Sequence, residues 1–160
     1  MADITTALTA PTLQPVAAVK TAVALGTLVL TLDGDMPVEF LTIGDRVLTR
    51  AGARRLQGIV VTVVQNARVI RIAQGSLGLD RPAADIIVPP TQPILIRDWR
   101  AKALFGSETA LVPAARLADG DYIRSEVLNE VRLYTLHFAE DVVIYAGGLE
   151  LACPATRVTA

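Results

Sequence analysis

Short runs of apolar and β-branched residues, separated by turn residues, dominate the chain from about residue 22 onward. Runs of this length are typical of β-strands, and closely spaced turns between them favour an all-β barrel or sandwich. We therefore expect an all-β fold. The pattern predicts strands at residues 27–33, 46–49, 58–64, 68–72, 85–88, 93–96, 131–138 and 141–145.

The residues between these runs predict how the strands connect. Asp33-Gly34 tolerates positive φ and closes the first strand. Gln65-Asn66 predicts a turn between two of the central strands, and Ala139-Glu140 predicts a hairpin that pairs the last two. Pro89-Pro90 marks a corner, because proline cannot donate to a ladder.

Helix is scarce in this pattern. Residues 37–41 and 113–117 each begin with a proline, which suits the first helical position, and each predicts a single helical turn. Residues 99–104 predict another short turn of helix. Residues 1–20 are rich in alanine, threonine and proline and follow no clear period, so we expect a flexible N-terminal arm there and one domain over 21–160.

Composition excludes several classes of function. The 160 residues favour one domain, and 52% hydrophobic against 19% charged residues is enough for a packed core. The net charge of −1 gives no global attraction to nucleic acid or to a membrane surface. One cysteine and one histidine exclude a disulfide framework and a zinc site on paired histidines. We expect no cofactor and no metal, whereas a protein partner stays open.

The sequence also bears on where the protein resides. The chain has no run of about 18 apolar residues of the kind that spans a membrane. Its N-terminus has an acid at Asp3 and lacks a basic region, so no signal peptide is evident. We expect a soluble protein that is either cytoplasmic or exported by a non-classical route.

An ordered series of motifs carries a family resemblance. A Gly-Thr strand at residues 26–34 is followed by Pro37-Val-Glu-Phe-Leu41 and by a Gly44-Asp45 strand start. This series resembles the Hint (Hedgehog/intein) family, in its bacterial Hedgehog/intein branch. The resemblance continues in order through residues 69–88, 111–117 and 142–150, and covers about 22 to 152. It implies a Hint-like horseshoe of short, twisted strands with an extended N-terminal arm.

The resemblance implies a chemistry that this sequence lacks at its key positions. Hint domains cleave the peptide bond at their own N-terminus with a cysteine or serine nucleophile and a histidine that protonates the leaving nitrogen. Ala22 stands at the nucleophile position and Gln92 at the histidine position. Phe138-Ala139-Glu140 stands where the branch often carries Asp-Arg-His. We therefore expect a degenerate, catalytically inactive self-processing domain that acts as a structural or interaction module.

The same resemblance places Ala22 and Gln92 on opposite walls of one cleft, so we expect them to lie near each other. The alternative to an inactive domain is residual N-terminal autoproteolysis by an N–O acyl shift. The nucleophile would be the hydroxyl of Thr21, or of Thr27, and His137 or a water would assist. An unassisted alcohol is almost wholly protonated near pH 7, so this alternative depends on finding a base.

Two further features stay outside this interpretation. Cys153 is too close to the C-terminus to fit the nucleophile position; it is a buried or free thiol in the cytosol, or a partner for an intermolecular disulfide in an oxidising compartment. Residues 50–55 carry three arginines in what we interpret as a turn between two strands. A solvated turn is the simpler interpretation, and contact with phosphate or an acidic partner is the alternative.

Overall fold

The computed structural model describes residues 12–13, 19–79 and 81–155, and most of its elements are strands. The all-β expectation is confirmed. The strands are β1 (Thr12–Leu13), β2 (Val23–Ala24), β3 (Leu28–Thr31), β4 (Gly34–Pro37), β5 (Arg46–Thr49), β6 (Gly52–Arg55), β7 (Gly58–Ile72), β8 (Ile86–Val88), β9 (Pro93–Ile96), β10 (Ala110–Pro113), β11 (Ile123–His137), β12 (Val142–Ala146) and β13 (Leu149–Cys153).

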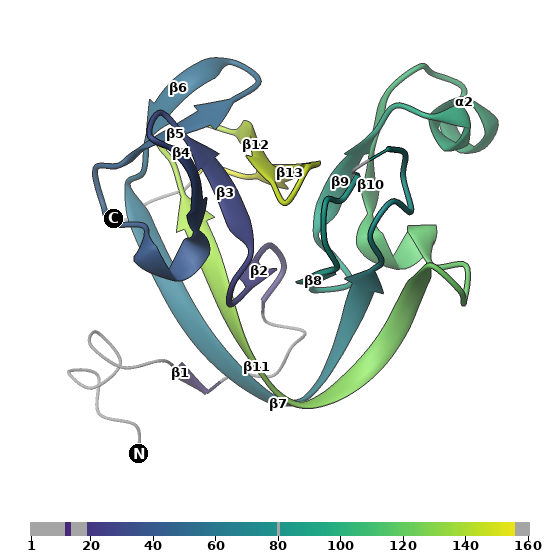
Figure 1. The fold of residues 1–160 in the computed structure, drawn as a ribbon, viewed down its shortest axis with the longest axis horizontal. Helices are drawn as coiled ribbons and strands as arrows, with labels where there is room; N and C mark the ends of the chain where they lie inside the picture. Colours follow the sequence, from purple (N-terminus) through teal and green to yellow (C-terminus); the bar gives the residue numbers. More distant parts are fainter. Residues whose placement is uncertain (1–11, 14–18, 80, 156–160) are drawn as a thin grey trace.

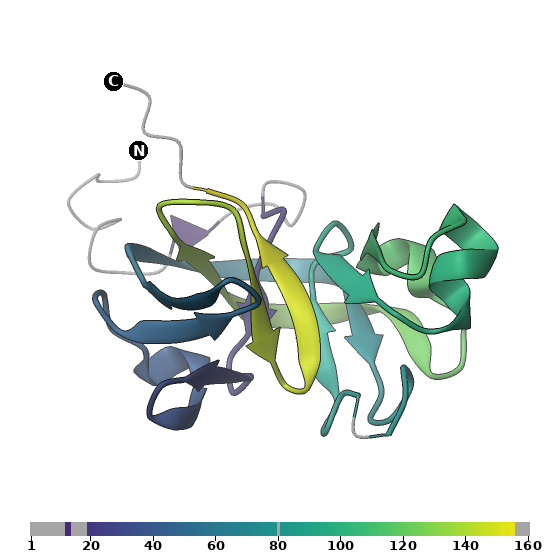
Figure 2. The same cartoon turned by 90° about the horizontal axis from the view of Figure 1, so that it is seen from above.

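The strands form two sheets that build a horseshoe. One sheet has the order β1-β7-β11-β2, with β8 also paired to β7. The other has the order β10-β9-β13-β12-β3-β5-β6, with β4 paired to β3. In Figure 1, β7 and β11 run side by side through the base and rise into two lobes. Figure 2 shows β12 and β13 lying between the lobes, where they join one to the other.

The prediction of a turn at Gln65-Asn66 is wrong, because β7 continues through it as one strand. β7 and β11 pair antiparallel over their whole length, and the ladder skips a single position between Ala67↔Leu128 and Gln65↔Glu130. At that position Asn66 has a φ of 50°. Asparagine takes the left-handed conformation more readily than most other residues that have a side chain, so the strand bends there. The pairing of β7 with β11 resumes at the next position.

The predicted hairpin between residues 131–138 and 141–145 is also wrong. β12 pairs with β13, β3 and β5, and none of its described partners is β11. Gly147 and Gly148, at φ 60° and 89°, turn the chain so that β13 folds back on β12. Two consecutive residues with positive φ suit a tight hairpin turn, and glycine adopts that conformation without a steric penalty.

The helical predictions are confirmed as short elements. Two 3-10 helices, η2 (Val38–Phe40) and η3 (Ala114–Leu117), follow the prolines that predicted them. The α-helix α2 (Trp99–Phe105) begins after Asp98, whose side chain accepts a hydrogen bond from the Arg100 N–H at 2.9 Å. An N-cap carboxylate satisfies one of the free N–H groups of the first turn.

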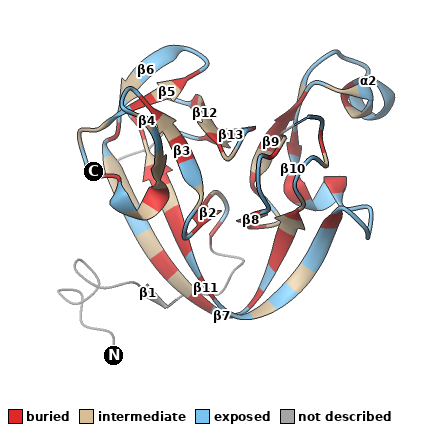
Figure 3. Cartoon of the chain, in the orientation of Figure 1, coloured by how far each residue is buried: buried red, intermediate tan, exposed pale blue. Residues whose placement is uncertain are grey.

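Two hydrophobic clusters hold the horseshoe together, and Figure 3 shows buried positions alternating with exposed ones along β7 and β11. The smaller cluster secures the start of the domain, because Val19, Ala22 and Ala24 pack there against β7 and β11.

β1 pairs in parallel with β7, at Thr12↔Thr62 and Leu13↔Val63. The predicted arm over 1–20 otherwise falls largely outside the described residues. No helix in the described ranges is long and apolar enough to cross a membrane.

Candidate functional site

The peptide bond between Thr21 and Ala22 is held on both sides by side chains. The backbone N–H of Ala22 donates a hydrogen bond to Oε1 of Gln92 at 2.9 Å. The hydroxyl of Thr135 donates to the carbonyl oxygen of Thr21 at 2.8 Å. A single peptide unit therefore has its donor and its acceptor both bound by side chains from distant parts of the sequence.

Strand pairing brings these groups together. β2 pairs antiparallel with β11 through Val23↔Tyr134 and Ala24↔Leu133. This register places the residues that precede β2 beside Thr135, the next residue along β11. Gln92 approaches from the opposite side, in the corner that leads into β9. The expectation that positions 22 and 92 lie close together is confirmed by their hydrogen bond.

Gln92 is fully buried and fully hydrogen-bonded. It is 1% exposed, and its Nε2 donates to the carbonyl oxygens of Pro93 and Ala152, both at 2.9 Å. Because both amide hydrogens meet carbonyl oxygens, Oε1 must be the atom that faces the Ala22 N–H. The network thus fixes Gln92 as a hydrogen-bond acceptor toward the peptide nitrogen.

A small cavity lies against this peptide. Its volume is about 10 Å³, close to the minimum that holds one water molecule. Most of its walls are apolar and come from the N-terminal segment, β11, β12 and β13. The lining residues are Thr21, Ala22, Val23, Gln92, Tyr134, Leu136, Ile144, Leu151 and Cys153.

Cys153 is the nucleophilic side chain that the sequence analysis set apart, and the structure places it in this cavity wall. Burial raises the pKa of its thiol to about 12. The nucleophilic form of cysteine is the thiolate, so at neutral pH the side chain is a protonated, unreactive thiol.

The other candidates lie in different environments. Thr21 lines the cavity, but the hydroxyl of Thr27 donates to the carbonyl of Ala24 at 2.8 Å within the turn after β2. His137 pairs with Gly58 at the end of β11 and does not belong to the cavity lining. Burial lowers its pKa below the usual value, so its neutral form is favoured.

The triplet at residues 138–140 and the arginine-rich segment at residues 50–55 are joined by an ion pair. Of the Phe138-Ala139-Glu140 triplet, Phe138 is fully buried in the large cluster, whereas Glu140 forms an ion pair with Arg54. Arg54 belongs to residues 50–55, and part of that predicted turn is strand β6, which pairs with β5. The two remaining arginines of the segment are Arg50, directly after β5, and Arg55, at the end of β6.

Two hydroxyl groups at the site were missed by the sequence analysis. Besides Thr135, Thr91 donates its hydroxyl to the carbonyl oxygen of Lys20 at 2.8 Å. The available signal was weak: Thr135 is a polar residue between apolar neighbours, and Thr91 adjoins Gln92. Neither position reveals its partner, because both bonds join segments about 70 or more residues apart.

The described residues hold no group of three or more histidine, cysteine or carboxylate side chains that could bind a metal ion. The arrangement around the Thr21–Ala22 unit supports hydrogen bonding to a backbone peptide. The groups that touch the Thr21–Ala22 unit are a neutral amide and a hydroxyl.

Comparison with solved structures places the fold among inteins. The chain is similar to a bacterial intein-like domain from Clostridium thermocellum, with a TM-score of 0.61, 16% identity, and coverage of 84% of this chain and 98% of that one. It is also similar to the TvoVMA intein, with a TM-score of 0.59, 12% identity, and coverage of 83% and 97%. The gp41-1 intein gives a TM-score of 0.53 at 16% identity, with coverage of 81% and 96%.

Sequence comparison gives the family. A search of curated protein sequences found no match. The sequence profile of the Hint domain family matches residues 21–152, a span that begins at the peptide held by Gln92 and Thr135 and includes all the strands from β2 to β12. The horseshoe fold and this match together show that the chain belongs to the Hint domain family.

Proposed function

We propose that this chain is a degenerate Hint domain that holds the peptide bond between Thr21 and Ala22 without cleaving it, and that it acts as a structural or interaction module. The Hint family is a self-processing type of domain, and the fold of this chain is that of the family. The observation that carries the proposal is the hydrogen bond from the Ala22 N–H to Oε1 of Gln92.

The first reason for inactivity is the missing nucleophile. Self-processing at this peptide requires a side-chain oxygen or sulfur on residue 22 to attack the carbonyl carbon of residue 21. Ala22 has only a methyl group. The thiol of Cys153 lines the same cavity, but its raised pKa leaves it protonated.

The second reason is the direction of the hydrogen bond at the nitrogen. When the C–N bond breaks, the leaving nitrogen has to gain a proton from a neighbouring acid. Gln92 presents an acceptor to this nitrogen, and both of its own amide hydrogens are bound to backbone carbonyls. A carboxamide neither takes up nor releases protons near neutral pH. The contact therefore stabilises the intact peptide rather than its cleavage.

Mass spectrometry of the intact, purified chain tests this proposal. We expect the full mass of the 160-residue chain after prolonged incubation, both alone and with hydroxylamine or a thiol. Hydroxylamine cleaves an ester or a thioester, a thiol cleaves a thioester, and neither cuts an ordinary peptide bond. Loss of residues 1–21 from the unmodified protein would overturn the proposal.

One observation favours a second candidate function, residual autoproteolysis one bond earlier. The hydroxyl of Thr21 would attack the carbonyl carbon of Lys20, form an ester, and leave the Thr21 nitrogen as a free amine that takes up the hydroxyl proton. Thr91 already donates to that carbonyl oxygen at 2.8 Å and would stabilise the developing oxyanion. We rank this function second because the side chain that the structure shows hydrogen-bonded to the Lys20–Thr21 peptide, among the described residues, is a hydroxyl and not a base.

The two candidates predict different masses, because the inactive domain stays at its full mass and the second candidate is cleaved. An ester at Thr21 would be cut by hydroxylamine after Lys20, so that the large fragment begins at residue 21. In that case Thr21→Ser would retain cleavage and Thr21→Val would abolish it. An uncleaved chain in all three proteins supports the inactive domain.

A further inference from the structure

Three arginine side chains converge on one buried carboxylate. Glu150 lies on β13 and is 3% exposed. Its Oε2 accepts a hydrogen bond from Arg50 at 2.6 Å. Its Oε1 forms an ion pair with Arg97 and lies 3.6 Å from the guanidinium of Arg81. The arginines come from three separate segments: the turn after β5, the loop between β7 and β8, and the end of β9.

The cluster carries an excess of positive charge. Burial by itself raises the pKa of Glu150, but hydrogen bonds from Arg50 and Arg97 and the charges of both lower it overall. Glu150 is therefore ionised at neutral pH and contributes one negative charge against three positive ones. Among the residues that the structure describes, two guanidinium charges are left without a counter-charge inside the cluster. The three arginine side chains are between 28% and 44% exposed, so they reach solvent.

A pocket of about 160 Å³ lies beside two of these arginines. The residues that line it are Leu77, Arg81, Ile96, Arg97 and Asp98. Asp98 does not neutralise the pair, because its carboxylate binds the guanidinium of Arg100 at 2.5 Å and the Arg100 N–H at 2.9 Å. The described wall of the pocket thus has two arginines, and the acidic residue within it, Asp98, is bound to Arg100.

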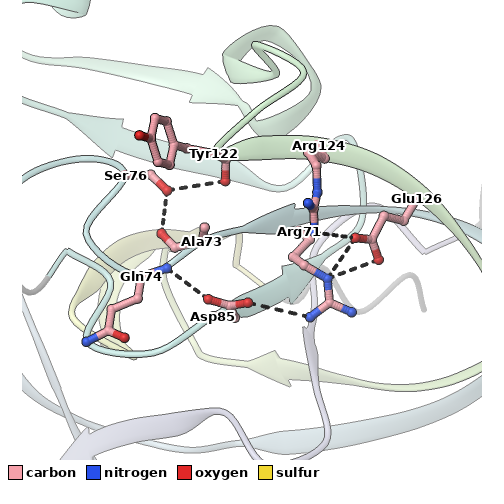
Figure 4. A network of polar contacts seen from close by, with 8 residues as sticks. All are labelled: Arg71, Ala73, Gln74, Ser76, Asp85, Tyr122, Arg124 and Glu126. Atoms are coloured by element: carbon pink, nitrogen blue, oxygen red, sulfur yellow. Dashed lines mark hydrogen bonds and ion pairs between the residues drawn. The ribbon is translucent and has the colours of Figure 1, made fainter.

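Hydrogen bonds hold the loop that carries Arg81 in place at several points. The Gln74 N–H donates to Asp85 at 2.9 Å, and the Ser76 hydroxyl contacts the carbonyls of Ala73 and Tyr122 (Figure 4). Within the loop, the Leu77 N–H donates to the carbonyl oxygen of Arg81 at 2.8 Å. A side chain on a loop that is held by hydrogen bonds loses less conformational entropy when a ligand binds than one on a freely moving loop.

We propose that Arg81 and Arg97 form a binding site for a doubly charged tetrahedral oxyanion of the phosphate class, either free phosphate or the terminal group of a phosphate monoester. Guanidinium groups match the geometry of phosphate oxygens through paired N–H donors. A dianion neutralises the two uncompensated charges of the cluster. Glu150 contacts Nη1 of Arg81 and Nη2 of Arg97 beside the pocket, which leaves the other N–H groups of both side chains for the ligand. The described lining of this pocket shares no residue with that of the cavity beside the Thr21–Ala22 peptide.

Titration of the isotope-labelled full chain, followed through its backbone amides by NMR, tests the site. Inorganic phosphate and glycerol phosphate are added at pH 7.5, with sodium chloride at equal ionic strength as the reference. We expect saturable shifts of the amides near residues 81 and 97 with phosphate and none with chloride. Shifts with both phosphate compounds would indicate recognition of the phosphate group, and shifts with inorganic phosphate alone would indicate a site for the free ion; both support the proposal.

Variants locate the interaction. Arg81→Gln and Arg97→Gln should each raise the dissociation constant for phosphate about tenfold or more. Arg124→Gln is the matched control, because it removes a guanidinium that is bound to Glu126 instead. Equal responses to phosphate and chloride, or an equal loss of binding in Arg124→Gln, would overturn the proposal. Should a variant fail to fold, phosphate shifts in the parent protein that map away from residues 81 and 97 overturn it equally.

Discussion

The side chain of Gln92 accepts a hydrogen bond from the backbone N–H of Ala22 at 2.9 Å. The two residues are 70 positions apart in sequence, and the family resemblance assigns them to the two positions that cleave a peptide in active relatives. We propose that the two positions keep the approach that they have in active relatives, while the groups on them differ. Retained geometry with altered chemistry makes the site open to reconstruction.

The double variant Ala22→Cys/Gln92→His should recover hydroxylamine-sensitive cleavage before residue 22. The thiol supplies a nucleophile, the imidazole supplies a proton to the leaving nitrogen, and the two act as a unit. Each single variant should cleave at least about 100-fold more slowly than the double variant, because general acid catalysis alone contributes that much. Intact mass spectrometry against time gives the rates.

The parent protein and the two single variants are the controls for this reconstruction. Cleavage of the parent at a rate similar to that of the double variant would contradict the inactive assignment. An uncleaved but folded double variant would show that the supporting groups, including the altered Phe138-Ala139-Glu140 triplet, have changed as well.

Thr135 should contribute to any cleavage that is recovered. Its hydroxyl already donates to the carbonyl oxygen of Thr21 at 2.8 Å, which is the oxygen that becomes negatively charged when residue 22 attacks. Adding Thr135→Val to the double variant should slow cleavage about 100-fold, since removal of one oxyanion donor has an effect of that order. Thr135→Ser keeps the hydroxyl and should keep most of the rate; equal rates in the valine and serine variants would contradict this role.

Gln92 should also be important for stability. Gln92→Leu leaves the Ala22 N–H and the carbonyls of Pro93 and Ala152 without their partner in a buried environment. We expect the free energy of unfolding to fall by about 3 kcal/mol, because each buried unpaired group costs about 1–3 kcal/mol. Urea denaturation measures the change. Gln65→Leu, at an exposed position, should change stability by no more than about 0.5 kcal/mol, and an equal effect in both variants would be inconsistent with the network.

Sequence patterns predicted the strands that consist of a compact apolar or alternating run of residues. β5 at Arg46–Thr49 and β9 at Pro93–Ile96 match the expected bounds, because each is a compact apolar or alternating run. β4 and β6 were missed since Gly34–Pro37 and Gly52–Arg55 have little strand propensity, and they form by pairing with β3 and β5. In these cases the partner strand, rather than the residues themselves, determines the structure.

The candidate site shows the same difference between what a local pattern predicts and what depends on distant partners. Positions 22 and 92 were found because an ordered family resemblance carries long-range information. Thr135 was not found, since its role depends on the register of β11 with β2, which no local pattern specifies. The three arginines around Glu150 lie up to 100 residues from it in sequence, and only the folded arrangement of the lobes brings them together.

Stability should fall as the pH drops below the ordinary pKa of histidine. His137 is the only histidine, and burial lowers its pKa in the folded state from the usual 6.5. Between the folded and the unfolded pKa the unfolded chain binds the extra proton, so acid favours unfolding in that window. Above about pH 7 this contribution is fully present. Urea midpoints measured across pH 5 to 7.5 check the effect, and His137→Gln should flatten the profile in that range. An unchanged slope in His137→Gln would show that other groups are responsible.

Cys153 should be inert in the folded protein, although it lines the same cavity as the Thr21–Ala22 peptide. Burial raises its thiol pKa from 9.0 to about 12, which lowers the thiolate fraction at a given pH by about a thousandfold. A thiol-specific reagent should therefore label Cys153 only at urea concentrations that unfold the chain, and Cys153→Ala should not be labelled at any concentration. Labelling in native buffer as fast as in denaturant would mean that the thiol is exposed and ionised, and it would make Cys153 a candidate nucleophile for the neighbouring peptide. Protection that is lost along the unfolding curve would instead show that the cavity wall keeps the thiol protonated, so that a peptide placed beside a cysteine remains uncleaved.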